Sequence, residues 1–157
     1  MNEALGNPAT LEALLDKYPD LVNDISTGGA QPLHMCGMSR GKQQATAILI
    51  ARGADIEALD TYGFTPLHRM ASNNLAVGAR ALLAAGADPA GGAGPGSSRR
   101  PGAVRQTPLD VARSSGAADV IKALQVHRRS SALLGMAIGP TCASSAERGD
   151  ICLRRST

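Results

Sequence analysis

The chain has 157 residues, 43% of them hydrophobic and only 2% aromatic, with a formal net charge of +3. This size fits one modest domain or a short array of repeats, and its core must be built from Leu, Ile, Val, Ala and Met. The three cysteines lack the spacing of a zinc site, the N-terminus shows no secretory signal, and no apolar run approaches the ~20 residues of a membrane helix. We therefore expect free thiols and a soluble protein without membrane association, in the cytoplasm or, alternatively, the nucleus.

The charge is unevenly distributed along the chain. Residues 1–89 carry six Lys or Arg against nine Asp or Glu, a balance of −3, whereas residues 90–157 carry ten against four, a balance of +6. The basic character therefore belongs to the second half.

Three related windows recur around a proline. They read AQPLHMC at 30–36, FTPLHRM at 64–70 and QTPLDVA at 106–112. An apolar pair follows the first two windows about 17 residues after the proline, and Leu124 follows the third; in the first two copies Gly53 and Gly86 come next. Glycine at that place ends a helix in the left-handed conformation. The pattern predicts a helix, a turn, a second helix and a hairpin, with a period near 33 residues that must stack on its neighbours.

The interval between the second and third windows is longer than the first interval. The excess lies in AGGAGPGSSRRPGAV, which has no hydrophobic period and is dense in Gly, Pro and Ser. This composition predicts a flexible loop at 90–104.

The stretch that contains the second window, DTYGFTPLHRMASNNLAVGARALLAAGADP, resembles the ankyrin repeat family at twelve positions. The matching residues are Asp60, Gly63, Thr65, Pro66, Leu67, His68, Ala71, Leu82, Leu83, Gly86, Ala87 and Asp88. The first copy fits with one extra residue around 39–43, and the stretch before it resembles the second half of an earlier repeat. The resemblance implies an all-α solenoid of stacked helix-turn-helix units with short β-hairpin loops, made of one partial and three recognisable repeats.

The expected boundaries follow from this resemblance. They are a truncated repeat at 1–25, whose TPLH would lie before residue 1, repeats at 26–59 and 60–89, the inserted loop at 90–104, a C-terminal repeat at 105–127 and a basic, flexible tail at 128–157. Two outcomes remain open for ALLGMAIG at 132–139: it folds back to shield Val120 and Leu124, or it leaves that end of the array exposed.

The Thr-Pro-Leu-His motif is explained by helix initiation. Thr65 is the expected N-cap, and Pro66 takes the first helical position, where its missing N–H costs nothing. In the third copy Asp110 replaces the histidine three residues after Thr107, as in a capping box. A metal-binding or proton-transfer role would not survive that replacement, so we interpret the histidines as structural, and Cys36 as a buried, inert thiol.

Two common signatures of enzymes are missing. The chain has no HExxH, and GGAGPG lacks the Lys-Ser/Thr ending of a phosphate-binding loop. We expect no enzymatic activity and no cofactor.

Binding is expected on the hairpin tips and the exposed side of the first helices, the surface that ankyrin-like arrays present. The candidates for protein binding are Thr61, Tyr62, Phe64, Arg69, Ser72, Asn73, Thr27, Met35 and Met38. Tyr62 flanked by Arg69 is the expected anchor. For Phe64 a second interpretation stays open, in which the ring packs under its own hairpin.

These inferences predict a non-catalytic protein–protein interaction module that presents a concave ankyrin face as a scaffold, adaptor or inhibitor, and that is monomeric. One alternative is a regulatory fragment or subunit of a larger enzyme. Another is weak nucleic-acid binding through the basic loop and tail, although nucleic acid is not the partner we expect. Arginine pairs also make Ser131 and Thr157 candidates for phosphorylation by basophilic kinases.

Overall fold

The structure, a computed structural model, describes residues 1–26, 28–91 and 106–137. Within these ranges the chain forms helices and loops and contains no β-strand. The α-helices are α1 (Pro8–Lys17), α2 (Pro32–Cys36), α3 (Ala45–Ala51), α4 (Pro66–Ser72), α5 (Ala76–Ala84), α6 (Pro108–Ser114) and α7 (Ala118–Ala137). Three short 3-10 helices accompany them: η1 (Ala4–Gly6), η2 (Pro19–Asn23) and η3 (Arg40–Lys42).

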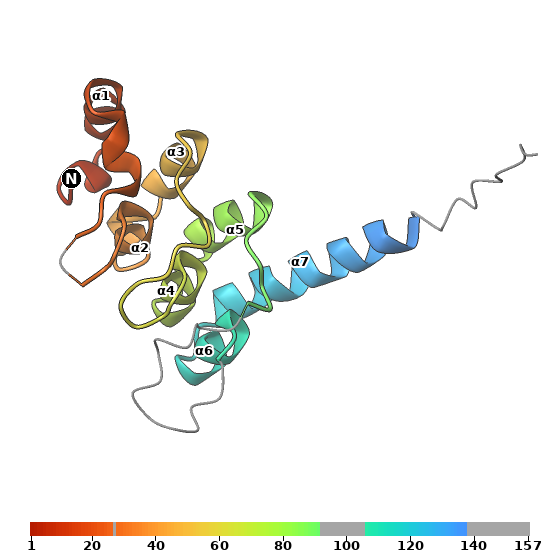
Figure 1. The fold of residues 1–157 in the computed structure, drawn as a ribbon. Coiled ribbons are helices and arrows are strands. Elements are labelled where there is room, and N and C mark those ends of the chain that lie inside the picture. Colours follow the sequence, from red (N-terminus) through yellow and green to blue (C-terminus); the bar gives the residue numbers. More distant parts are fainter. Residues whose placement is uncertain (27, 92–105, 138–157) are drawn as a thin grey trace, which may run out of the picture.

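The helices stack in two rows (Figure 1). Helices α2, α4 and α6, which begin at the three repeated prolines, pack against one another in one row, and α1, α3, α5 and α7 form the second row. Each of the three complete units contributes one α-helix to each row, the first unit contributes α1 to the second row, and every unit contacts its neighbours. This arrangement confirms the predicted all-α solenoid, with hairpin-shaped loops that contain no strand residues in the described ranges.

One continuous apolar core runs through the array. Leu49, Leu82 and Leu124, the leucines predicted to face it, are 0%, 0% and 1% exposed and belong to the same cluster of buried residues. Burying a leucine contributes about 1.5–3 kcal/mol. Because the core is shared between repeats, no repeat could bury its apolar face alone.

Proline occupies the first turn of each first helix, as predicted, and the residue before it is the N-cap. At α6 the backbone N–H of Asp110 donates to Oγ1 of Thr107 (3.2 Å), and the backbone N–H of Thr107 donates to Oδ2 of Asp110 (3.1 Å). The predicted capping box is therefore present. Hydrogen bonds from the hydroxyl and the backbone N–H of Thr107 hold the pKa of Asp110 below its ordinary value.

Two elements differ in length from their counterparts. In the first repeat α2 has only five residues, and the predicted extra residue is accommodated where η3 forms before α3 begins. In the last repeat α7 continues to Ala137, ten residues beyond the expected boundary at His127. The backbone from Ala132 to Ala137 extends away from the array (Figure 1), so this part does not fold back over it. Shielding is unnecessary, because Val120 and Leu124 are already buried between the helices.

Candidate protein-binding groove

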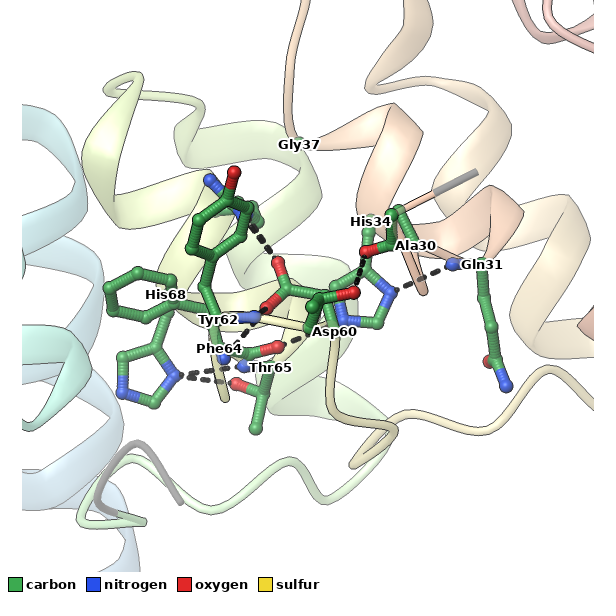
Figure 2. Close-up of polar contacts among 12 residues, drawn as sticks. Ala30, Gln31, His34, Gly37, Asp60, Tyr62, Phe64, Thr65 and His68 are labelled. Atoms are coloured by element: carbon green, nitrogen blue, oxygen red, sulfur yellow. Dashed lines mark hydrogen bonds and ion pairs between the residues drawn. The ribbon is translucent and has the colours of Figure 1, made fainter. Parts of the chain in front are cut away.

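Asp60 organises the hairpin that precedes α4. Its side chain is 1% exposed, and Oδ1 accepts hydrogen bonds from the backbone N–H groups of Tyr62 (2.8 Å) and Phe64 (3.0 Å). Oδ2 accepts from Nε of Arg69 (2.8 Å) and also from Nη2. Burial works to raise the pKa of Asp60, but the N–H of Phe64 and the Arg69 guanidinium outweigh it and hold this pKa below its ordinary value. A buried carboxylate that is satisfied in this way fixes the shape of the hairpin tip (Figure 2).

Arg69 is fixed by the same arrangement. Its guanidinium carbon lies 5.4 Å from the ring centre of Tyr62 and 5.2 Å from that of Phe64, within the range of cation–π attraction. Tyr62 nevertheless remains 63% exposed, because only one side of its ring is used in this contact. The arginine therefore serves first as a support that orients Tyr62.

The two motif histidines connect consecutive repeats. Nε2 of His34 donates to the carbonyl of Phe64 (3.0 Å), and Nε2 of His68 donates to the carbonyl of Gln106 (2.9 Å). A carbonyl only accepts, so the proton is on Nε2, and Nδ1 is the acceptor that receives the backbone N–H of Gln31 or Thr65 (3.3 Å in each case; Figure 2). Both nitrogens of each ring are thus occupied, as the structural interpretation of these histidines requires.

Neighbouring hairpin tips are also joined directly. The backbone N–H of Thr61 donates to the carbonyl of Gly28 (3.3 Å), and the Thr61 hydroxyl donates to the same oxygen. The tips of the first and second repeats therefore lie side by side.

A groove of about 430 Å³ lies between these tips and the first helices α2 and α4. Four predicted binding residues border it: Met35, Met38, Tyr62 and Arg69. Met38 is 55% exposed and Met35 is partly buried, so the groove is bordered by two flexible methionines and an exposed aromatic ring. The remaining lining residues are Ser26, Gly28, Ala30, His34 and Asp60.

A smaller hollow of about 90 Å³ adjoins the groove and shares Ser26, Ala30 and Met35 with it. Its other borders are Met1, Asn2, Leu5, Asp24 and Pro32. These shared residues place the two hollows next to each other. The contribution of Met1 and Leu5 was missed from the sequence, because a partial repeat gives no register for the residues that lie beside α2.

Several predicted binding residues lie elsewhere. Phe64 is partly buried against the core with its ring 5.6 Å from that of His68, which agrees with packing under its own hairpin. Thr61 bonds to the neighbouring tip, and neither it nor Ser72 borders the groove. Thr27 and Thr157 lie outside the described residues, as does the side chain of Ser131, whose backbone belongs to α7.

Asn73, another predicted contact, ties α4 to α2. Its Nδ2 donates to the carbonyl of Gly37 (2.8 Å) and it does not border the groove. A Cβ at Gly37 would lie only 2.6 Å from Cβ of Arg69, so glycine is needed for this close approach of the two helices.

The described residues show no cluster suited to binding a metal ion, and their one cysteine is unreactive. No three His, Cys, Asp or Glu side chains gather there in a way that could hold a metal ion. Cys36 is fully buried, as expected, and burial raises the pKa of its thiol to about 12, so the reactive thiolate is suppressed. Within the same part of the chain no helix is both long and apolar enough to cross a membrane.

Comparison with known proteins assigns the repeats. Residues 2–91, more than half of the chain, match the family described as ankyrin repeats, in three copies. The chain belongs to the ankyrin repeat family. The match spans the expected partial repeat and the two repeats after it, while the α6–α7 pair beyond it stacks in the same manner.

A yeast protein shares part of this sequence. The target of rapamycin complex 2 subunit AVO2 of Saccharomyces cerevisiae is 38% identical over 63 residues, which is 40% of this chain and 15% of that protein. The aligned part thus covers a small fraction of the relative's length.

Proposed function

We propose that this ankyrin-repeat chain is a non-catalytic interaction module that binds a partner protein in the groove between its first two hairpin tips. The observation that carries the proposal is that Tyr62, Met38 and Met35, predicted from the repeat register to contact a partner, border one groove on a rigid scaffold. Ankyrin repeats are a protein-interaction fold, and an exposed aromatic anchor beside methionines suits that role.

Preorganisation is the physical basis of the proposed affinity. Asp60 and Arg69 hold Tyr62 in place before any partner arrives, so little side-chain freedom remains to be lost on binding. The methionines opposite are flexible and adapt to the apolar side chain that enters.

The relative favours a role as a subunit or scaffold within an assembly. Its printed name makes AVO2 a subunit of a complex, and we extend to this chain only the idea of holding another protein without catalysis. Of the alternatives, a regulatory piece of a larger enzyme is compatible with the same groove. The alternative of weak nucleic-acid binding rests on the basic loop and tail, which lie mostly outside the described residues, and the groove adds no support for it, because its one arginine is paired with Asp60.

An affinity pulldown tests the proposal. Wild-type chain, a Tyr62→Ala/Met38→Ser variant and a Tyr18→Ala control are immobilised and exposed to the same extract. Tyr18 is a suitable control because it is 48% exposed and borders neither hollow. We expect proteins retained by wild type and control to fall about tenfold or more with the groove variant, as for loss of a hot-spot residue. Equal retention by all three chains would remove the groove as the binding site.

The same variants must remain folded. Tyr62 makes one cation–π contact at the surface, so Tyr62→Ala should lower the free energy of unfolding by no more than about 1 kcal/mol. A larger loss in urea denaturation would make Tyr62 a structural residue.

A further inference from the structure

The loops that follow the second helices are rich in carboxylates. Within residues 19–26, 53–60 and 86–91 there is no Lys or Arg. The exposed carboxylates of these loops, here called the acidic edge, are Asp20, Asp24, Asp55, Glu57 and Asp88. The flanking cations are engaged elsewhere: Arg52 pairs with Asp16 (2.7 Å), and Lys17 lies over the ring of Tyr18 (5.1 Å).

Hydrogen bonds between repeats hold these loops side by side. Oδ1 of Asn23 accepts the backbone N–H of Asp55 (2.9 Å), and Oε1 of Glu57 accepts the backbone N–H of Asp88 (2.7 Å). Asn23 and Glu57 each lie nine residues before the motif proline of their repeat, so the same connection is made twice. The acidic edge is therefore one continuous surface that crosses the repeats.

Two exposed apolar side chains lie among these carboxylates at equivalent positions. Ile25 and Leu59 each precede the motif proline by seven residues and are 67% and 51% exposed. Neither borders the groove. An exposed apolar pair repeated at the same register, and flanked by negative charge, fits a partner surface that alternates apolar and basic side chains.

Helix α7 presents such a surface. Lys122, Val126 and Arg129 follow the i, i+4, i+7 spacing of one helix face, and all three are exposed, Val126 by 63%. The helix packs on the array through Val120, Ala123 and Leu124, which are buried. Lys122 and Arg129 are about 10 Å apart along the helix axis, which matches the ~8–10 Å between packed neighbouring helices and hence between adjacent repeats. We call these three residues the basic stripe.

We propose that the acidic edge of one molecule binds the basic stripe of a second copy of this chain, with Val126 contacting Ile25 and Leu59 and the two cations facing the carboxylates. Within one molecule Val126 does not reach Ile25, because Ile25 lies in the loop after α1, and α7 is at the opposite end of the array and extends away from it (Figure 1). The contact is head-to-tail, so it adds molecules one after another instead of closing a two-fold dimer. It departs from the monomer expected from the sequence, and its apolar pair lies outside the groove, while Asp24 borders the smaller hollow beside the groove.

Sedimentation velocity of the full chain over a concentration series tests this proposal. Wild type should show a rising average sedimentation coefficient at low salt and a much smaller rise at high salt, because exposed ion pairs are weak and screened. Wild type that stays monomeric throughout the series at low salt would overturn the proposal.

Two double variants remove charge without removing local structure. In Asp55→Asn/Glu57→Gln the new amide oxygens still accept the N–H groups of Glu57 and Asp88 that the carboxylates accept. Lys122→Gln/Arg129→Gln neutralises the stripe. Each of these two variants should abolish the concentration dependence of the sedimentation coefficient. The control Glu3→Gln/Glu12→Gln makes the same charge change as the edge variant, on exposed residues outside the acidic edge, and should keep that dependence. Association that survives both edge and stripe variants, or that fails equally in the control, would refute the proposed contact.

Mixing identifies the head-to-tail geometry. The edge variant retains a stripe and the stripe variant retains an edge, so their mixture should form a one-to-one dimer that grows no further, although each alone is monomeric. No dimer in the mixture would contradict the pairing of these two surfaces.

Leu59→Ser should weaken wild-type association severalfold, while Val77→Ser, at an exposed position on α5, should leave it unchanged. The opposite pattern would exclude the apolar part of the contact.

Discussion

His34 and His68 join repeats only in their neutral form. In each ring Nε2 carries the proton given to a carbonyl of the next repeat, and Nδ1 must remain bare to accept a backbone N–H. Burial lowers the pKa of both side chains, outweighing the carbonyl hydrogen bonds and the nearby Asp60, which act to raise it; Arg69 acts with burial. These histidines therefore stabilise the array at neutral pH, and their protonation in mild acid destabilises it.

The sign of this effect gives a prediction for the pH dependence of stability. Above about pH 6.5, the ordinary pKa of histidine, both folded and unfolded chains carry neutral histidines. The two side chains then make their full contribution to the free energy of unfolding. As the pH falls below 6.5 the unfolded chain takes up protons that the folded chain resists, so the free energy of unfolding decreases. Urea denaturation in steps below pH 6.5 should show this decrease in wild type and a nearly flat profile in His34→Gln/His68→Gln.

The variant His34→Gln/His68→Gln should also have a lower free energy of unfolding than wild type at neutral pH. Leaving the N–H of Thr65 without its buried acceptor should cost about 1–3 kcal/mol at neutral pH. Asp60 does not interfere, because its lowered pKa places its own loss of stabilisation below about pH 3.8. An equal decrease in wild type and variant between pH 6.5 and 4.5 would assign the titration to other groups.

Residues differ in how far their roles can be predicted. The repeat register predicted Tyr62, Met35 and Met38 as surface positions, because residues that do not hold the scaffold are free to face outward; all three border the groove, and their binding role stays a prediction. The support that Arg69 gives to Tyr62 was not predictable. It depends on a hairpin that returns Asp60 to within hydrogen-bonding distance of a residue nine positions later, and such geometry leaves no trace in local sequence patterns.

Among the elements, α7 receives its N-terminal cap from the preceding repeat. The residues before it, Gly116 and Ala117, have no side-chain acceptor. Oδ1 of Asn74, in the turn between α4 and α5, instead accepts the backbone N–H groups of Asp119 (3.1 Å) and Val120 (3.4 Å). Free N–H groups at a helix start need such an acceptor, so one side chain both caps α7 and ties two repeats together.

Two substitutions at Asn74 distinguish the effect of its side-chain hydrogen bonds to α7 from the effect of its left-handed backbone conformation. Asn74 has φ of 52°, a left-handed conformation that suits Asn and Gly but is unfavourable for Ala. Asn74→Gly should lose only the hydrogen bonds, about 1 kcal/mol of unfolding free energy. Asn74→Ala should lose about 1–2 kcal/mol more through backbone strain. Thermal or urea denaturation would measure both, and a Gly variant as stable as wild type would show that the cap contributes nothing.

The starts of the helices were more predictable than the ends. Proline after an N-cap marks the beginning of α2, α4 and α6 in both sequence and structure. The end of α7 was misplaced because the repeat pattern stops near His127, whereas the helix has no physical reason to stop there. No Gly or Pro occurs between residues 117 and 134, so nothing in this stretch breaks the helical backbone.

At the scale of the whole molecule, stability should be graded along the array. Each unit packs only on its neighbours, so a central unit is supported from both sides and an end unit from one. Helix α4 contacts α2, α5, α6 and α7, whereas α1 contacts α3, η1 and η2. The last turns of α7 extend beyond the packed helices (Figure 1).

Native-state hydrogen exchange should reveal this gradient. Amides of α4 and α5 should exchange slowest, with protection that approaches the global free energy of unfolding, because opening them breaks contacts on both sides. Amides of α1 should exchange faster, and those from Ser130 to Ala137 fastest among the α-helices, since this backbone extends beyond the packed helices. Asn74→Gly should then raise exchange in the first turn of α7 more than in α1, because the cap acts at that joint. Uniform protection from α1 to α7 would mean that the array opens as a single cooperative unit and that its repeats are not coupled mainly through nearest neighbours.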